Sequence, residues 1–329
     1  MTYDDLPGFE AACDSPYINW TQPHALPDEA VDPLKFTYRG SRGYNGDRSY
    51  PSSVDTRKYY PLYMINENVD FLAKENFSAF PASQPDVEYI ISASNRGLSY
   101  RMLESEKLQQ AVAEMGSGPR PVTGFACAFY YLCQPNTAVR LYYEPYWDAL
   151  RRPGVFKVAV NVRVGDQVFE KGEQPSDAAA LLRMAEPYFE CARRIEAEFA
   201  IPGQQVVWYF MSDSHVLKTA AASRFGSKLL TDGELRMVHP DCKMHNAGNC
   251  AAQEMEASMQ HSIGQLLTFS LADYHVYTKE SGFGRLGAWL SGKEGGNLFP
   301  ISTRHSGTCN PRSPTPPAVS ATQSGTAGV

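Results

Sequence analysis

Three short runs of apolar and β-branched residues in the second half of the chain constrain the fold most strongly. They are VFKVAVNVRV at 155–164, VVWYFMSDS at 206–214 and HVYTK at 275–279, and sequence with helical spacing separates them. Strands that are apolar throughout and alternate with helices are typical of a parallel sheet covered on both faces. Right-handed crossovers bring the carboxyl ends of such strands to one edge, where open α/β sheets bind ligands. The pattern therefore predicts an α/β fold with one ligand-binding edge.

Helical spacing fills the intervals between these runs. Between 188 and 199, Tyr188, Ala192, Ile195 and Phe199 recur on one helix face, and Pro187 fits the first position of that helix. The remaining elements predicted in this half are helices at 215–225, 252–271 and 281–290 and a short strand at 228–231.

The first half of the chain is less regular. The segment 86–97 predicts a strand that ends in a turn, and 101–115 predicts a helix. FACAFYYLC at 125–133 fits either a buried strand or a turn of helix, and 140–152 ends in a predicted short helix.

These elements divide the chain into four predicted parts. Residues 1–59 are rich in Pro, Gly, Tyr and charge and form an irregular amino-terminal arm. Residues 60–150 form a smaller α/β domain, whose completeness the sequence leaves open, and 151–301 form the larger α/β domain. Residues 302–329 are rich in Ser, Thr, Pro and Gly. They are predicted to be a disordered tail, because such a composition buries too little apolar surface to offset the entropy of ordering.

Charge argues against a nucleic-acid-binding protein, and hydropathy argues against a protein that spans a membrane. The 329 residues carry a net charge of −6, whereas a nucleic-acid-binding surface needs a basic excess, so we expect no nucleic-acid partner. No window of 18 or more apolar residues occurs, and the first 30 residues lack the basic and apolar segments of a signal peptide. Contact with a membrane would therefore need an amino-terminal anchor that is missing from this sequence.

The seven cysteines are spaced irregularly. An odd number without a regular spacing predicts no disulfide framework, and Cys127 and Cys133 are interpreted as core thiols. The segment HPDCKMHNAGNC at 239–250 contains ligand types that bind zinc, but its spacing matches no common finger. We interpret it as a loop without a ligand, with a zinc site or a Cys242–Cys250 disulfide as alternatives.

Polar residues gather where the three predicted strands end. In chain order they are Asn161, Arg163 and Asp166, then Ser212, Asp213 and Ser214, then Thr278, Lys279, Glu280, Ser281 and Gly282. Because the strands are expected to be parallel, these three groups should share one edge of the sheet.

This set of groups suits the diphosphate of a nucleotide. The guanidinium of Arg163 can bridge two phosphate oxygens. Ser281, Gly282 and Phe283 begin a predicted helix, whose amino-terminal N–H groups attract anions. The sequence lacks GxGxxG and GxxxxGK[ST], so neither the dinucleotide fingerprint nor the P-loop is present.

Acidic groups would complete such a site, and each polar group also has a structural alternative. Asp213 or Asp273 can accept hydrogen bonds from ribose hydroxyls or from guanine N–H groups. Alternatively, Arg163 forms a surface ion pair with Asp166, and the serines of both clusters only cap the helices that follow them.

The segments VNVRVGD, WYFMSDS and DYHVYTKESGFGRLGAWLSG resemble, in this order, the three donor-site motifs of the fucosyltransferase superfamily. The resemblance covers about residues 155–292, and more weakly SNRGLSY at 94–100. This superfamily includes protein O-fucosyltransferases, α1,6- and α1,2-fucosyltransferases and algal and plant relatives. The resemblance implies a GT-B fold, with two Rossmann-like domains, parallel sheets and the donor bound by the second domain.

The resemblance also implies roles for individual residues. Arg163 matches the arginine that contacts the β-phosphate of the donor, and Asp213 falls in the segment near the nucleoside. Asp273 and Ser281 match the acidic residue and the phosphate-contacting serine of the third motif. Asn161 stands where the family usually has a histidine.

The activity implied by the resemblance is the inverting transfer of L-fucose from GDP-fucose to a protein or glycan hydroxyl. No metal or other cofactor is expected, and the compartment is the lumen of the Golgi or the endoplasmic reticulum. Arg163 and Asp166 are the candidate catalytic residues. Candidates for the base are Asp166, Glu170, His239 and His245, among which the sequence does not choose. The alternatives are an inactive relative that binds a nucleotide sugar or glycan, and a GT-B glycosyltransferase that uses another nucleotide sugar.

Overall fold

The computed structural model describes residues 9–15, 59–64, 89–94, 121–165, 167–170, 173–233, 252–293, 295–302 and 309–311. Its centre is a five-stranded parallel sheet in the order β7-β6-β5-β8-β9. The strands are β5 (Phe156–Val162), β6 (Val206–Ser212), β7 (Leu229–Leu230), β8 (Tyr274–Thr278) and β9 (Leu298–Ile301). The predicted parallel sheet is therefore confirmed, with β9 as a strand that the sequence patterns did not indicate.

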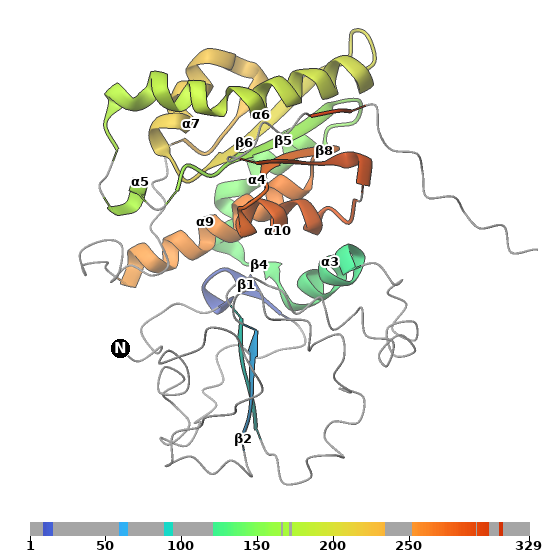
Figure 1. Cartoon of the computed structure of the whole chain (residues 1–329). Helices are drawn as coiled ribbons and strands as arrows, with labels where there is room; N and C mark the ends of the chain where they lie inside the picture. Colours follow the sequence, from blue (N-terminus) through green and yellow to red (C-terminus); the bar gives the residue numbers. More distant parts are fainter. Residues whose placement is uncertain are drawn as a thin grey trace, which may run out of the picture.

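Helices cover both faces of this sheet (Figure 1). One face carries α6 (Ala178–Phe199) and α7 (His215–Phe225), and the other carries α4 (Thr137–Arg151), α9 (Ala252–Ser270) and α10 (Gly282–Leu290). Successive residues of a strand point to opposite faces, so Val158, Val160 and Val162 pack toward α6 while Ala159 packs toward α9. Both faces of the sheet carry apolar side chains, because helices cover each of them.

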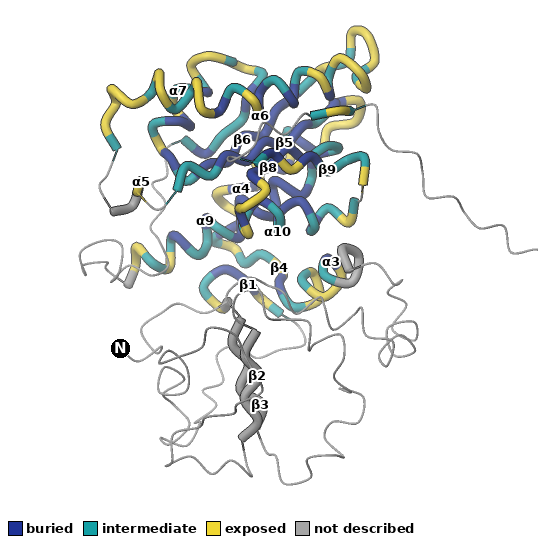
Figure 2. The backbone as a smooth tube through the Cα atoms, viewed as in Figure 1, coloured by how far each residue is buried: buried dark blue, intermediate teal, exposed yellow. Residues whose placement is uncertain are grey.

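Aromatic rings fill the core between the sheet and the first of these helix layers. Phe189 of α6 packs against Phe210 of β6 with ring centroids 5.3 Å apart and against Phe225 of α7 at 4.7 Å. Trp208 stacks on Phe189 at 6.3 Å. Burying a large apolar side chain contributes about 1.5–3 kcal/mol. Figure 2 shows the central strands β5, β6 and β8 buried and the outer faces of the helices exposed.

The other described elements are short or lie before the sheet. They are β1 (Cys13–Asp14), β2 (Tyr59–Met64), β3 (Tyr89–Ser94), α3 (Pro121–Leu132), β4 (Gln134–Pro135), α5 (Gln167–Glu170) and four 3₁₀ turns, at Phe9–Ala11, Pro175–Asp177, Gly226–Lys228 and Gly295–Asn297. β1 and β4 form an antiparallel pair, and β2 and β3 form a parallel pair. The strand predicted at 86–97 is confirmed as β3.

Two helices from the predicted amino-terminal domain pack onto the carboxyl-terminal one. The Tyr130 hydroxyl of α3 donates to the Leu290 carbonyl at 3.1 Å, and the Trp147 indole of α4 donates to Thr268 Oγ1 at 2.8 Å. These helices therefore contact elements on both sides of the predicted boundary at residue 151, which stays a prediction.

Three local predictions need comment. Pro187 lies inside α6 rather than at its start, because the alanine-rich sequence from Ala178 has a helix propensity high enough to extend the helix by nine residues. The run at 125–133, which fitted a strand or a helix, belongs mostly to α3. The predicted helix at 101–115 lies outside the described residues.

The prediction that the chain has no disulfide framework is wrong. Disulfides join Cys13 to Cys133 and Cys191 to Cys309. The partners are 120 and 118 residues apart, so no local spacing could reveal them. Within the predicted tail, Cys309 is thereby attached to α6. Cys127 is an exposed free thiol rather than a core thiol.

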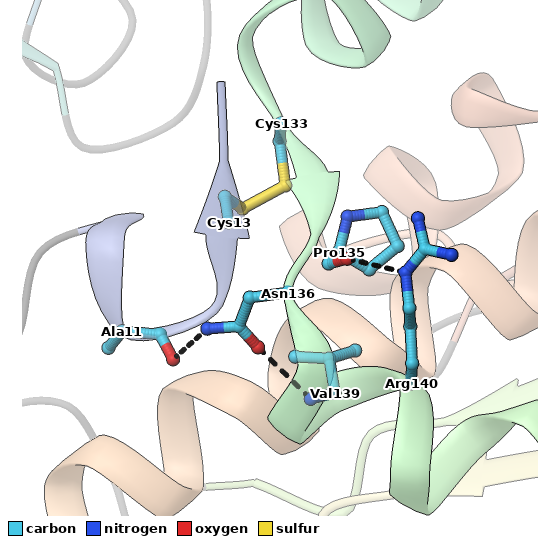
Figure 3. Close-up of a disulfide and its surroundings, with 7 residues drawn as sticks. All are labelled: Ala11, Cys13, Cys133, Pro135, Asn136, Val139 and Arg140. Atoms are coloured by element: carbon cyan, nitrogen blue, oxygen red, sulfur yellow. Dashed lines mark hydrogen bonds between the residues drawn. A yellow bond between two sulfur atoms is a disulfide. The ribbon is translucent and has the colours of Figure 1, made fainter. Parts of the chain in front are cut away.

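The Cys13–Cys133 disulfide fixes the amino-terminal segment to the start of α4 (Figure 3). The Asn136 side chain accepts from the Val139 N–H at 3.1 Å, which caps α4, and donates to the Ala11 carbonyl at 3.0 Å. One side chain therefore begins a helix and binds a segment more than 120 residues away in sequence.

A buried ion pair joins three helices at the end of β7. The Lys218 ammonium lies 3.1 Å from Asp232 Oδ1, and both side chains are almost fully buried. Asp232 Oδ2 accepts from the Tyr143 hydroxyl at 2.7 Å and from Gln265 Nε2 at 2.5 Å. Because buried charges need partners, this set fixes α4, α7 and α9 around one carboxylate.

No helix in the described part of the chain is both long enough and apolar enough to cross a bilayer.

Candidate functional site

Asp213, just after β6, holds the segment that leaves β5 at the carboxyl edge of the sheet. Its Oδ1 accepts from the Val164 N–H at 2.8 Å, and its Oδ2 accepts from the Gly165 N–H at 3.0 Å. The Arg163 guanidinium lies 2.9 Å from Oδ2. Gly165 has a backbone φ of 127°, which residues with a Cβ atom rarely adopt. Sequence reasoning placed Arg163 and Asp213 at this edge, and the structure brings them into contact.

The Asp213 carboxylate is nearly inaccessible to solvent, with 6% of its side chain exposed. Burial raises its pKa, against the opposing effects of the Arg163 charge and the two amides. Both carboxylate oxygens bind the chain itself. Asp213 is therefore arranged to position Arg163 and the following turn, and its assignment to a nucleoside stays a prediction.

The serines on either side of Asp213 also bind the chain. The buried Ser212 hydroxyl donates to the Val162 carbonyl at 2.8 Å and accepts from the Ser214 N–H at 3.1 Å. Ser214 Oγ accepts from the Leu217 N–H at 2.9 Å and so caps α7. These contacts match the structural alternative that the sequence offered for this cluster.

Glu173 is a residue at this edge that sequence reasoning did not identify. Its Oε2 accepts from the His215 N–H at 2.8 Å and from the Val216 N–H at 3.3 Å, and its Oε1 accepts from the Ser214 hydroxyl. A carboxylate thus lies against the first turn of α7, where the helix dipole favours an anion. Glu173 precedes Ser214 by 41 residues, so no local pattern indicates the contact.

Thr278, at the end of β8, connects Arg163 with the amino terminus of α10. Its Oγ1 accepts from the Arg163 N–H at 3.0 Å, and its carbonyl accepts from the Ser281 N–H at 2.9 Å. Arg163 and α10 are therefore neighbours at one edge, as the sequence predicted for the groups that follow β5 and β8.

The amino terminus of α10 is open. Ser281 caps the helix by accepting from the Gly284 N–H at 3.2 Å. The N–H groups of Gly282 and Phe283 have no acceptor among the described residues. Gly282 is exposed, and a Cβ built on it would meet no atom within 4 Å. The Phe283 side chain packs on the apolar core, so this residue offers its N–H alone to the edge.

Asn161 lies beneath the first turn of α10 rather than on the open edge. Only 3% of it is exposed, and its Nδ2 donates to the Met211 carbonyl at 3.5 Å. Its Oδ1 has no hydrogen-bond partner among the described residues. A Cβ on Gly284 would lie 2.1 Å from this oxygen, so the close approach of helix and strand requires glycine at 284.

Asp273, which was predicted to accept from the nucleoside, does not lie at this edge. Asp273 precedes β8, and its Oδ2 accepts from the Lys157 N–H at 3.0 Å near the start of β5. Its Oδ1 lies 3.5 Å from the Lys157 ammonium and 3.4 Å from that of Lys293. In parallel strands these positions share the amino edge, about 16 Å from the carboxyl edge at about 3.3 Å per residue.

The candidate bases fall largely outside the described residues. Asp166, His239 and His245 are not among them, and Glu170 belongs to α5 without a described side chain. In the ranges that the structure describes, no group of three or more His, Cys, Asp and Glu side chains is placed to hold a metal ion.

The fold of this chain is similar to that of a known fucosyltransferase. A point mutant of Arabidopsis thaliana FUT1 in complex with GDP superposes with a TM-score of 0.56 and 13% sequence identity, over 87% of this chain and 60% of that one. The chain thus spans less than two thirds of the length of that protein.

A second solved structure gives a weaker match. Fucosyltransferase NodZ from Bradyrhizobium aligns at 12% identity over 67% of this chain and 56% of that one, with a TM-score of 0.36, which is too low to support an argument. No protein-family model matches the sequence, and no curated protein matches it significantly. At these identities the comparisons establish the fold and leave the activity to be argued from the site.

Proposed function

We propose that this chain is a fucosyltransferase-like glycosyltransferase. In this proposal it transfers L-fucose with inversion from GDP-fucose to a hydroxyl of a protein or a glycan, without a metal ion. The observation that carries the proposal is that Thr278 binds both the backbone N–H of Arg163 and the N–H of Ser281, the cap of the open α10 terminus. The similarity of the α/β fold to that of a GDP-bound fucosyltransferase supports it.

The diphosphate would lie between a cation and a helix terminus. The Arg163 guanidinium, oriented by Asp213, can donate to oxygens of the β-phosphate. The N–H groups of Gly282 and Phe283 can donate to the same phosphate, and the dipole of α10 adds to the attraction. The Ser281 hydroxyl, which accepts from the Gly284 N–H, retains its hydrogen for a phosphate oxygen.

In the transfer step these groups stabilise the leaving group, GDP. The acceptor oxygen attacks C1 of fucose from the face opposite the diphosphate, the C1–O bond to the β-phosphate breaks, and GDP takes the electron pair. Arg163 and the α10 N–H groups stabilise the negative charge that develops on GDP, a task that a metal ion performs in other glycosyltransferases. The acceptor proton passes to a base, for which Asp166, Glu170, His239 and His245 remain the candidates.

One observation favours a second candidate, a relative that binds a nucleotide sugar without transferring it. Asn161 stands in the position of the family histidine, is buried under α10 and presents no group to the open edge. If the histidine is essential for transfer, this chain would bind the donor only. Release of free fucose from GDP-fucose, or transfer to an acceptor, separates the two candidates.

The two disulfides support a proposal on the compartment. Disulfides persist in oxidising compartments and are rare in the cytosol, so Cys13–Cys133 and Cys191–Cys309 favour the secretory lumen. We expect these four cysteines to resist alkylation in protein isolated under non-reducing conditions and to react after reduction. Alkylation of all four without reductant would contradict the proposal.

The test of the donor site is calorimetric titration with GDP and GDP-fucose, and with UDP as the control nucleotide. We expect selective binding of the guanine nucleotides and a loss of tenfold or more in affinity in Arg163→Ala, about 1.4 kcal/mol. The matched variant is Arg152→Ala, because Arg152 is exposed and lies between α4 and β5, at the opposite edge of the sheet. Equal affinity in both variants, or no nucleotide binding by folded protein, would overturn the proposed donor site.

A further inference from the structure

Glu173 fills a position that a bound anion usually takes. The amino terminus of a helix offers N–H groups and a positive dipole end to phosphates and carboxylates. At α7 these N–H groups, from His215 and Val216, donate to Glu173 Oε2, and the capping Ser214 hydroxyl donates to Oε1. Both carboxylate oxygens are therefore bound, as the oxygens of a phosphate would be.

The place of Glu173 in the chain gives this contact a further effect. The segment that leaves β5 begins with Arg163, and Asp213 holds that first part through the Val164 and Gly165 N–H groups. Glu173, ten residues after Arg163, attaches the other end of this segment to the first turn of α7. The junction between β6 and α7 thus binds both ends of the segment that carries the proposed phosphate ligand.

We propose that Glu173 is a built-in anion that closes the amino terminus of α7 to ligands and positions the segment that begins with Arg163. As a positioning residue, it closes α7 and leaves α10 open, of the two helices at this edge that begin with a serine cap. An anionic ligand is then directed to α10 and Arg163 instead of being divided between two helix termini. The inference goes beyond the proposed function, because it concerns the internal carboxylate and holds for any anionic ligand.

The test removes the carboxylate and supplies another from solution. In Glu173→Ala the N–H groups of His215 and Val216 lose their acceptor, and we expect the melting temperature to fall by about 2–4 °C. Sodium acetate, exchanged for sodium chloride at constant ionic strength, should recover most of this loss, because acetate offers the same carboxylate to the vacated site. If Glu173 only packed against its neighbours, acetate would not raise the melting temperature of Glu173→Ala.

Two further variants complete the design. Glu144→Ala is the matched control, since Glu144 is exposed on α4 and its side chain forms no hydrogen bond or ion pair with another described residue. Its melting temperature should respond to acetate as the wild type does. Glu173→Gln keeps the shape and one acceptor oxygen, so it should be less destabilised than Glu173→Ala and gain little from acetate. It also keeps the test available if Glu173→Ala does not fold.

The outcomes separate this inference from the proposed donor site. An acetate-dependent rise in melting temperature that is larger for Glu173→Ala than for the wild type and Glu144→Ala supports the inference, whether or not GDP binds. Equal responses of the three proteins overturn it. If the wild type binds GDP, Glu173→Ala should bind about three- to tenfold more weakly in chloride, and acetate should restore the affinity. An affinity equal to that of the wild type in chloride would overturn the positioning role.

Discussion

Two helices, α7 and α10, begin at the same edge of the sheet and meet different surroundings. Each follows a strand of the sheet, and each is capped by a serine that accepts from the N–H group three residues on, Ser214 from Leu217 and Ser281 from Gly284. At α7 the first-turn N–H groups bind the Glu173 carboxylate. At α10 the corresponding groups have no acceptor among the described residues.

A helix amino terminus at a ligand-binding edge is therefore not by itself a ligand site. The sequences around the two caps, SDSHV and KESGF, each show a serine after a strand and before a helix. What separates them is a glutamate 41 residues before Ser214. The availability of a helix terminus therefore depends on the fold around it.

The contact between α10 and β5 should be the most sensitive to substitution. In Gly284→Ala the new Cβ would lie 2.1 Å from Asn161 Oδ1, so helix and strand must separate, and we expect a loss of about 3 kcal/mol in the free energy of unfolding. The control is Gly282→Ala in the same turn, where the Cβ meets no atom and stability should not fall. Urea unfolding of both variants measures the difference, and equal stability would refute the close approach.

The strands that precede α7 and α10 should contribute differently to the pH dependence of the free energy of unfolding. Burial, helped by the charge of Lys293, lowers the pKa of His275 in β8 to about 3, whereas β6 contains no histidine or carboxylate. Between about pH 6.5 and 3 the unfolded state binds a proton that the folded state does not, so stability falls as the pH falls through this range.

The expected loss from His275 is about 2 kcal/mol between pH 7 and pH 5. His275→Gln removes the titrating group, so its unfolding free energy should change less over this interval than that of the wild type. The measurement is urea unfolding at a series of pH values. Parallel curves for the two proteins would show that His275 is not the group responsible.

Removing each cap should affect the two helices differently. Ser281→Ala loses one cap and should cost about 1 kcal/mol. Ser214→Ala loses a cap and a donor to Glu173, so we expect a larger cost, of about 2 kcal/mol. In a double-mutant cycle, Ser214→Ala and Glu173→Ala should show a coupling energy above about 0.5 kcal/mol, whereas Ser281→Ala and Glu173→Ala should be additive. Additivity in both cycles would remove the distinction between the termini.

The smallest expected effect concerns salt. A charge near a helix terminus is screened by ions, so the stability difference between the wild type and Glu173→Gln should shrink by a few tenths of a kcal/mol from low to high ionic strength. The difference between the wild type and Ser281→Ala involves no formal charge and should stay constant. Unfolding of the three proteins at two salt concentrations is sufficient, and a constant difference for Glu173→Gln would argue against a charge–dipole contribution.

Much of the fold could be predicted, because it depends on local pattern. The apolar runs at 155–164 and 206–214 could only be satisfied by a sheet covered on both faces, and the spacing over 252–271 indicated a helix within one residue of α9. The meeting of Arg163 with the start of α10 followed from the parallel order of strands, without any knowledge of the contacts.

The parts that could not be predicted depend on contacts distant in sequence. Cys13 and Cys191 have partners more than 100 residues away. Glu173 contacts the start of α7 although α6 and β6 lie between them in sequence. Asp273 was misplaced for a different reason. It was judged by its motif rather than by its position before β8, where a parallel strand brings it to the amino edge.

The two disulfides also determine how this protein would respond to mechanical force. The loops that they close, 13–133 and 191–309, do not overlap and contain most of the chain. A force applied to the ends passes through the two sulfur–sulfur bonds and bypasses the residues inside each loop. The sheet strands β6, β7, β8 and β9 lie within the second loop, so they are shielded from tension along the chain. With both disulfides intact, pulling would extend only the two ends and the stretch from Cys133 to Cys191, which contains β5; under reducing conditions the full contour length would become available.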